Sequence, residues 1–220
     1  MEKIIKEFNI YNFNELDENA QNKALEIISN DEVDVYSTWL LHDDMLDELE
    51  NIMNIEFNIK IDENLKTYYS LDYSQGSGAM FENEFYIEDI NKKYKFLTDD
   101  ELKLITSRCY ITKIKIKHND SHYYHKYSFN IDYYLDVYDD YDDIKDDYSI
   151  SENDFYNLEN KIDDFFKENN IFYNDIVSIN DRLTKFGYDC LEYFWNKDNI
   201  INIINDNDYK FYIDGSVFNG

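Results

Sequence analysis

The chain contains no proline, five glycines and two cysteines among its 220 residues. The cysteines, Cys109 and Cys190, lie far apart without nearby partners, so they predict neither a disulfide framework nor a zinc site. The N-terminal residues hold no apolar run behind a basic segment, and no stretch of about 18 apolar residues occurs. These absences argue against a secretory signal or a membrane span. We therefore expect a cytoplasmic protein without a membrane partner.

Basic residues are also scarce. Lysine and arginine number 21 against 48 aspartates and glutamates, which gives a formal net charge of −27. Such a charge disfavours direct binding to nucleic acid, because that binding depends on neutralising phosphates with lysine and arginine. It likewise disfavours anionic membranes and attracts proteins with basic grooves. Solubility alone is the simpler explanation, whereas adaptation to high salt fits poorly with the abundant lysine, asparagine and isoleucine.

A hydrophobic content of 43%, including 18% aromatic residues, indicates a folded protein with a substantial core. Periodicity predicts one α+β domain over residues 1–220, with an antiparallel sheet of about five to six strands packed against N-terminal and C-terminal helices. Strands are expected at Ile5–Phe13, Ile55–Ile61, Thr67–Tyr73, Ala79–Tyr86, Cys109–His118, His122–Val137 and Tyr209–Ile213. Helices are expected at Leu16–Ser29, Glu32–Asn54, Asp99–Ser107, Ser151–Asn169, Asp175–Lys185 and Tyr188–Asn205.

Two of these elements carry more detailed expectations. In the helix over residues 32–54, six residues form the expected inward stripe, namely Val35, Trp39, Met45, Leu46, Leu49 and Met53. In the strand over residues 109–118, alternation places three residues on one face, namely Thr112, Ile114 and Ile116, and three on the other, namely Lys113, Lys115 and Lys117.

A glycine pair marks the segment Ser74–Ala79, between two of the expected strands. Glycine suits a backbone with positive φ or a close approach by another group. One interpretation is a hairpin turn or bulge. The other is a loop whose amides, with the Gln75 side chain, hold a ligand or partner. The candidate residues of this ligand loop are Gln75, Gly76, Ser77 and Gly78.

Three of the four histidines, His118, His122 and His125, fall within eight residues. Imidazole serves as a metal ligand and as an acid–base group near neutral pH. In an extended strand His122 and His125 would point to opposite faces, which is poor spacing for a metal. His122 and His125 remain candidates for contacting a ligand, or are structural. No GxSxG nucleophile motif or P-loop occurs, so we expect no enzyme, cofactor or metal site.

An acidic tract covers residues 139–148, with six aspartates and one lysine. Aspartate is unfavourable inside helices and like charges repel at this spacing, so a solvated loop is expected. A row of carboxylates interleaved with tyrosine can imitate phosphates with bases beside them. The alternative is an acidic loop without a partner. The candidate partner-binding residues are Asp139, Asp140, Tyr141, Asp142, Asp143, Asp146 and Asp147.

Four stretches together resemble one family of uncharacterised phage and prophage proteins, loosely labelled antitoxin-like. They are the first helix region over residues 8–24, the segment Tyr69–Phe81 with its SQGDGA-like motif, the HYYH hairpin over residues 116–125, and the closing segment Ile200–Gly215. The resemblance implies a phage setting and a shared α+β fold, and it supplies no reaction. The family pattern has aspartate between the two glycines, where this chain has Ser77.

The net negative charge, the acidic tract over residues 139–148 and the resemblance to phage proteins favour a phage-encoded accessory protein in the host bacterial cytoplasm. It would bind and inhibit a basic host protein, such as a nucleic-acid-handling defence complex, in the manner of an anti-CRISPR. A second hypothesis is a small-molecule or nucleotide site, or a hydrolase, built from Gln75–Gly78 and the histidine hairpin. It requires Gln75, His122 and His125 to converge on one pocket. A third is an antitoxin that neutralises a basic toxin through the same acidic surface.

Overall fold

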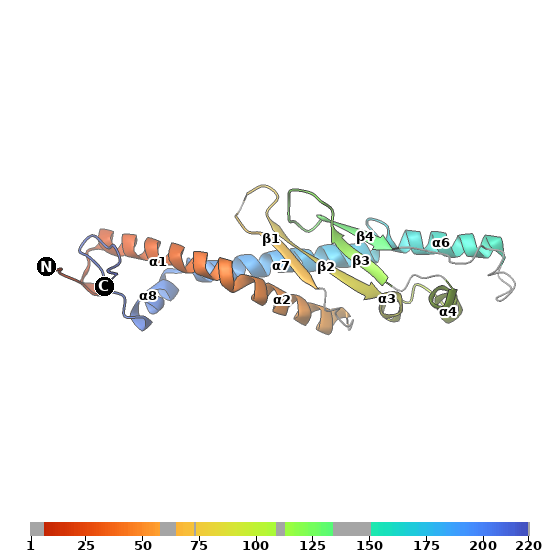
Figure 1. The fold of residues 1–220 in the computed structure, drawn as a ribbon, viewed down its shortest axis with the longest axis horizontal. Coiled ribbons are helices and arrows are strands. Elements are labelled where there is room, and N and C mark those ends of the chain that lie inside the picture. The colour runs from red at the N-terminus through yellow and green to blue at the C-terminus, as the bar shows by residue number, and fades with distance from the viewer. Residues whose placement is uncertain (1–6, 58–64, 73, 109–112, 134–150, 220) are drawn as a thin grey trace, which may run out of the picture. The chain divides into compact units, whose positions relative to one another are not determined.

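The computed structural model describes residues 7–57, 65–72, 74–108, 113–133 and 151–219. Helices combine with one antiparallel sheet, which confirms the α+β class (Figure 1). Contacts divide the chain into two compact units. Unit 1 comprises residues 1–42 and 188–220, and unit 2 comprises residues 43–187. That the whole chain forms one domain stays a prediction.

Unit 1 is helical and brings the two ends of the sequence together. Its main elements are η1 (Phe13–Glu15, a 3₁₀ turn), α1 (Glu18–Trp39) and α8 (Lys197–Asp206). Asp17 caps α1, because its carboxylate accepts a hydrogen bond from the Ala20 amide at 2.9 Å. Aliphatic and aromatic side chains from these elements form the core, namely Phe13, Leu16, Ala20, Ala24, Ile28, Ile200, Ile204 and Phe211.

The strands expected at the two ends of the chain are wrong. In the described residues Tyr11 pairs with Phe211, and Phe211 with Val217, as isolated bridges. The Tyr11 amide donates to the Phe211 carbonyl at 2.9 Å, and the reverse bond measures 3.0 Å. The pairing does not extend into strands, because the chain enters η1 after Tyr11 and the turn at Asp214 after Phe211.

The first helices also differ from expectation. α1 continues through Asn30 and Asp31, where the sequence suggested a break, and ends at Trp39. A new helix, α2 (Leu41–Ile52), then begins. Because α1 and α2 are separate helices, the apolar periodicity does not run on from one to the other and the expected inward stripe is interrupted. Met45, Leu49 and Met53 are buried, whereas Val35 and Trp39 are exposed.

Unit 2 contains the sheet and most of the remaining helices. Its strands are β1 (Lys66–Ser70), β2 (Gly78–Tyr86), β3 (Lys113–His118) and β4 (Phe129–Tyr133). Its helices are the π-helical turn η2 (Met53–Phe57), α3 (Ile87–Tyr94), α4 (Asp99–Arg108), α6 (Glu152–Phe166) and α7 (Ile171–Tyr193), the last residues of which belong to unit 1. The described residues 55–57 of the strand expected at 55–61 are therefore helical, and residues 58–61 lie outside the described part.

The sheet has four strands in the order β1-β2-β3-β4, all antiparallel, where five to six strands were expected. Its register pairs Thr67 with Phe81, and Phe85 with Ile114. Ile114 and Ile116 of β3 are buried and the lysines between them are more exposed, so the expected alternation is confirmed for the described residues. Thr112 lies outside the described residues.

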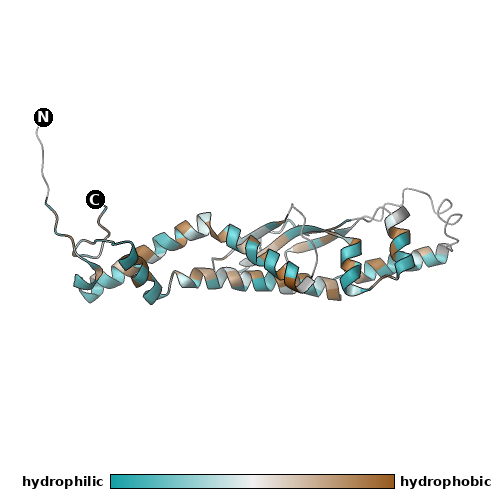
Figure 2. Cartoon of the chain, turned by 90° about the horizontal axis from the view of Figure 1, so that it is seen from below, coloured by the Kyte–Doolittle hydropathy of each residue, from teal (hydrophilic) through white to brown (hydrophobic). Residues whose placement is uncertain are grey.

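Helix α7 lies along the inner face of this sheet (Figure 1). The Ala79 amide donates to Thr184 Oγ1 at 2.8 Å, and at the other end of β2 the Phe85 ring meets Phe172 edge-on at 6.2 Å. Strand and helix therefore run side by side for most of β2. Hydrophobic residues alternate with polar ones along the helices (Figure 2), as expected for helices with one buried face.

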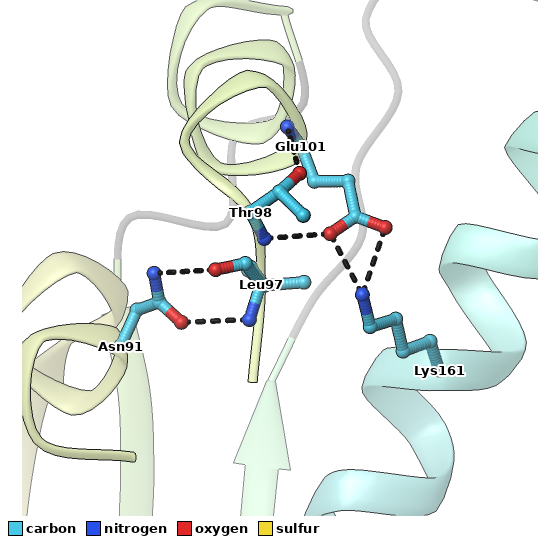
Figure 3. Close-up of polar contacts among 5 residues, drawn as sticks. All are labelled: Asn91, Leu97, Thr98, Glu101 and Lys161. Carbon is cyan, nitrogen blue, oxygen red and sulfur yellow. Dashed lines mark hydrogen bonds and ion pairs between the residues drawn. The ribbon is translucent and has the colours of Figure 1, made fainter. Parts of the chain in front are cut away.

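A polar corner joins α3, α4 and α6 (Figure 3). The buried Asn91 side chain donates to the Leu97 carbonyl at 3.1 Å and accepts from the Leu97 amide at 2.8 Å. Thr98 and Glu101 form a capping box at the start of α4. Lys161 of α6 donates to both Glu101 carboxylate oxygens, at 2.7 and 2.8 Å. These bonds fix the turn between α3 and α4 against α6.

The C-terminal helices agree broadly with the sequence. Ser151 caps α6, accepting from the Asp154 amide at 3.2 Å as its capping pattern predicts. α7 is longer than expected at both ends, and residues 194–196 separate it from α8, within the helix expected at 188–205. In the part of the chain that the structure describes, every helix is too short or too polar to cross a lipid bilayer.

Candidate functional site

The glycine-containing loop, described at residues 71–72 and 74–77, lies between β1 and β2, as the hairpin interpretation predicted. The Ser77 amide donates to the Ser74 carbonyl at 3.1 Å, which closes a tight turn. Gly76, within the turn, has φ +91°, a conformation that side chains with a Cβ atom rarely adopt. The turn chemistry therefore accounts for Gly76 in a chain that uses glycine sparingly.

Asp72 anchors this loop from its exposed position. Its carboxylate accepts hydrogen bonds from the Ser77 hydroxyl, from the Ser74 hydroxyl at 2.8 Å and from the Ser74 amide at 3.2 Å. These donors stabilise the ionised carboxylate and lower the pKa of Asp72 from 3.8 to about 2, and the Ser77 hydroxyl contributes most to this shift. Ser77, which occupies the aspartate position of the resembled motif, thus serves as a donor to Asp72.

The histidine-containing loop over residues 119–128 connects β3 to β4. His125 Nδ1 accepts a hydrogen bond from the Tyr127 amide at 3.1 Å, and His118 Nε2 lies 3.3 Å from the Tyr123 carbonyl. His122 is exposed. One ring nitrogen of His118 and one of His125 therefore hold the loop's own backbone, which is a structural role.

The two loops pack directly against each other. A Cβ atom added to Gly76 would lie 2.1 Å from Tyr123 Cδ1. One added to Gly78 would lie 2.9 Å from the Tyr124 carbonyl oxygen and 3.1 Å from His125 Cα. Both glycines thus admit the neighbouring loop at distances that a side chain would prevent. The structure brings the predicted Gly76, Gly78 and His125 into one place.

Helix α7 supports both loops from beneath. The Thr184 hydroxyl accepts a hydrogen bond from the Ala79 amide and donates one to the Asn180 carbonyl at 2.8 Å. Asn180 Nδ2 donates to the Lys126 carbonyl at 3.3 Å, and Lys126 Nζ pairs with Asp181 at 2.8 Å. Sequence reasoning missed these α7 residues, because nothing local in the sequence relates Thr184 to Ala79, which lies 105 residues earlier.

Aromatic rings gather beside this contact. The ring centroids of Tyr68 and His118 lie 6.0 Å apart, and those of His118 and Tyr124 lie 5.1 Å apart. Glu82 connects them, accepting from the Tyr68 hydroxyl and from the His118 amide, each at 3.0 Å. Burial, together with the Glu82 bond, raises the pKa of Tyr68. The hydroxyl therefore stays protonated and acts as a hydrogen-bond donor at neutral pH.

The outer face of the sheet carries several lysine–carboxylate ion pairs. Glu84 accepts from Lys113 at 2.8 Å and from Lys115 at 2.5 Å, and these two lysines lower its pKa. Lys117 pairs with Asp132 at 2.8 Å. Charged residues from β1 to β3 line a shallow hollow of about 320 Å³ on this face, among them Lys66, Glu82, Glu84, Lys115 and Lys117. Opposite charges nearly balance there, so the hollow has no strong preference for an anion or a cation.

The helices carry the excess negative charge. α2 contains five acidic residues and no lysine or arginine, namely Asp43, Asp44, Asp47, Glu48 and Glu50. Among the described residues Asp47, Glu48 and Glu50 have no ion-pair partner. The predicted acidic tract lies outside the described residues, with all of its candidates, Asp139, Asp140, Tyr141, Asp142, Asp143, Asp146 and Asp147. Within the described ranges no three His, Cys, Asp or Glu residues form a group that could hold a metal ion.

Comparison with known proteins adds a family. Residues 41–185 match a domain of unknown function, DUF8835. The chain belongs to this family. The matched range nearly coincides with unit 2, and it includes the sheet, both loops and all of α2. No curated protein and no solved structure matches the chain.

Proposed function

We propose that this DUF8835 protein is a phage-encoded accessory protein that binds and inhibits a basic host protein in the bacterial cytoplasm. The partner that best fits its charge is a nucleic-acid-handling defence complex, which makes the protein anti-CRISPR-like. The phage setting comes from the motif resemblance, including the SQGDGA-like segment Tyr69–Phe81. Family membership supplies neither the setting nor the activity.

The net charge of −27 carries this proposal. The arrangement of charge in unit 2 supports it, because the sheet lysines meet carboxylates while α2 presents carboxylates without lysine or arginine. Such a surface steers a basic partner and raises its association rate, and it does so most strongly at low ionic strength. A protein that needed charge only for solubility would have no reason to bind one partner in a salt-dependent way.

The acidic tract is the proposed point of contact. Its six aspartates would occupy phosphate positions in a basic nucleic-acid channel, with Tyr141 beside them in place of a base. Binding would then block the channel by occupation. Each phosphate-like contact would be weakened by salt, because screening shortens the range of charge interactions to roughly 8 Å at physiological ionic strength.

The test replaces the tract and compares it with a charge-matched control. One variant carries Asp→Asn at the six tract aspartates. The control removes six exposed carboxylates outside α2 and the tract by amide substitution, at Glu7, Glu26, Glu88, Asp100, Glu168 and Asp206. We expect the tract variant to lose partner capture while the control retains most of it. Equal capture by both variants and the unchanged protein would refute the mimicry.

A ligand site at the paired loops is the second candidate, favoured by one observation. Gly78, the first residue of β2, lies against His125 of the histidine-containing loop. The hypothesis itself requires Gln75, His122 and His125 to converge on one pocket. The ligand would be a small molecule or nucleotide, with Gln75, Ser77, His122 and His125 as contacts. Calorimetry with nucleotides should then show binding that Gln75→Ala and His122→Ala both weaken. Unchanged binding in both variants would exclude these residues.

An antitoxin role uses the same acidic surface against a basic toxin. It differs from the first proposal in the partner's identity. A captured host nuclease or defence complex supports inhibition of host defence, whereas a small basic protein encoded beside this chain supports neutralisation of a toxin.

A further inference from the structure

Apolar side chains lie exposed at the end of α1, in unit 1. Trp39 is 74% exposed, and Val35, one helical turn before it, is 54% exposed. Leu40 follows immediately and is 53% exposed. Periodicity alone predicted that Val35 and Trp39 face a core. Exposed apolar groups of this size, grouped on one stretch of helix, are typical of an interaction surface.

A second segment brings aromatic residues beside this helix. The Phe194 ring packs against the Tyr36 ring at 4.8 Å, and the Phe194 carbonyl accepts from the Ser29 hydroxyl at 2.6 Å. Phe194 is thus fixed against α1. Its neighbours Tyr193 and Trp195 are both about half exposed. We call the five exposed residues that flank the Tyr36–Phe194 pair the aromatic patch, namely Val35, Trp39, Leu40, Tyr193 and Trp195.

Carboxylates dominate the sequence around the aromatic patch. Residues 31–40 and 188–198 contain one basic residue, Lys197. They contain six acidic residues, namely Asp31, Glu32, Asp34, Asp189, Glu192 and Asp198. A second copy of the chain would bring these carboxylates against each other, which opposes self-association through the patch. An anionic membrane is repelled in the same way.

We propose that the aromatic patch binds a lysine- or arginine-rich segment of the partner protein that also carries apolar side chains. This inference rests on the proposed function and deepens it by locating a docking surface for the basic partner. Trp39 would be the anchor, because tryptophan provides a large apolar area and a ring face that attracts cations. The surrounding carboxylates would pair with the segment's basic side chains.

Both tryptophans of the chain belong to the aromatic patch, so fluorescence reports on it alone. Trp195→Phe leaves Trp39 as the sole indole. The probe is a synthetic amphipathic helical peptide of lysine and leucine. Its controls are a glutamate–leucine peptide and a lysine–serine peptide of the same pattern. We expect the lysine–leucine peptide to shift Trp39 emission to shorter wavelength and to bind at least about tenfold more tightly than either control.

Variants separate the aromatic patch from charge in general. Trp39→Ser should weaken the lysine–leucine peptide by about tenfold or more, as for a buried anchor. The matched control is Tyr156→Ser, which removes an exposed ring from α6 and should leave the affinity unchanged. Circular dichroism of each variant verifies that the helices remain.

Several results would overturn the inference. These are an equal emission shift with the glutamate–leucine peptide, equal affinity of Trp39→Ser and Tyr156→Ser, and a dimer in sedimentation that Trp39→Ser abolishes. Different results test the docking surface and the proposed function. If the unchanged protein and Trp39→Ser capture the same host protein equally, the docking surface is wrong and the function stands. If the peptide binds at Trp39 while no basic host partner is captured, the function is wrong.

Discussion

Unit 2 contains two kinds of polar group, and they differ in whether the protein itself satisfies them. At the α3–α4–α6 corner and on the sheet face, Asn91, Glu101 and Glu84 each meet two or more bonding atoms. In contrast, the structure gives no ion-pair partner to Asp47 and Glu50 of α2, and no hydrogen-bond partner to either amide atom of the buried Asn83, among the residues that it describes. Paired groups hold the fold together, and unpaired exposed acids are available to another molecule.

The paired corner gives the largest expected effect. Asn91→Ala leaves the amide and carbonyl of the buried Leu97 without partners, so we expect a loss of about 2–3 kcal/mol in the free energy of unfolding. Chemical denaturation measures the loss. Asn91→Asp is the matched control, because it retains the acceptor for the Leu97 amide and removes the donor. A loss below about 0.5 kcal/mol for Asn91→Ala would show that the corner does not depend on this side chain.

Replacing the buried, unpaired Asn83 should raise the free energy of unfolding, in contrast to Asn91→Ala, which lowers it. Asn83 is 2% exposed, and neither its Nδ2 nor its Oδ1 has a hydrogen-bond partner in the described part of the chain. Replacing it with leucine removes a buried, unsatisfied polar group, so we expect a gain of about 1 kcal/mol. Asn83→Ala serves as the control, because it removes the same amide and leaves a cavity. A clear loss of stability in Asn83→Leu would contradict the description of Asn83 as unpaired.

Substitution of Glu84 measures how much its ion pairs with Lys113 and Lys115 stabilise the fold. Glu84→Gln leaves Lys113 and Lys115 without their carboxylate, and we expect a loss of about 1 kcal/mol at neutral pH. The two lysines lower the Glu84 pKa below 4.5, so its stabilisation is complete above pH 4.5 and is lost as pH falls through the folded-state pKa. Denaturation across that range should show wild type and variant converging. A gap that does not change with pH would exclude the ion pairs as its cause.

The smallest expected change in stability comes from removing acidic residues of α2. Asp47→Asn with Glu50→Gln removes like charges spaced three and four residues apart, so we expect a gain of about 0.5 kcal/mol at low salt. The gain should disappear in about 1 M salt, where the screening length falls to roughly 3 Å. Thermal unfolding at both salt concentrations measures it. A loss of stability at low salt would mean that these acids have partners, and would remove the contrast with the sheet.

The sequence predicted the strongly periodic elements well. The strand over 79–86 and the helix over 99–107 agree with β2 and α4 to within one residue at each end, because each carries its own signal of alternation or capping. The terminal strands were wrong because alternation over a few residues does not show whether a partner strand exists. The break after Trp39 was misplaced, since neither proline nor glycine marks it.

The candidate site was predicted in its parts and not in its assembly. Glycine scarcity marked Gly76 and Gly78, and histidine clustering marked His125. Their contact is set by antiparallel pairing of β2 with β3 and by α7 beneath, which depend on long-range packing. Tyr123, whose ring fills the space beside Gly76, had no signal in a chain with 22 tyrosines.

In the proposed function, the acidic surface binds one basic host protein. The most direct measurement is affinity purification of the tagged full chain from a host lysate at low and high salt, with mass spectrometry of the bound proteins. We expect one enriched nucleic-acid-handling protein with a basic groove, captured at low salt and largely released at about 1 M salt. Capture of no basic protein at low salt, or capture that salt does not change, would contradict it.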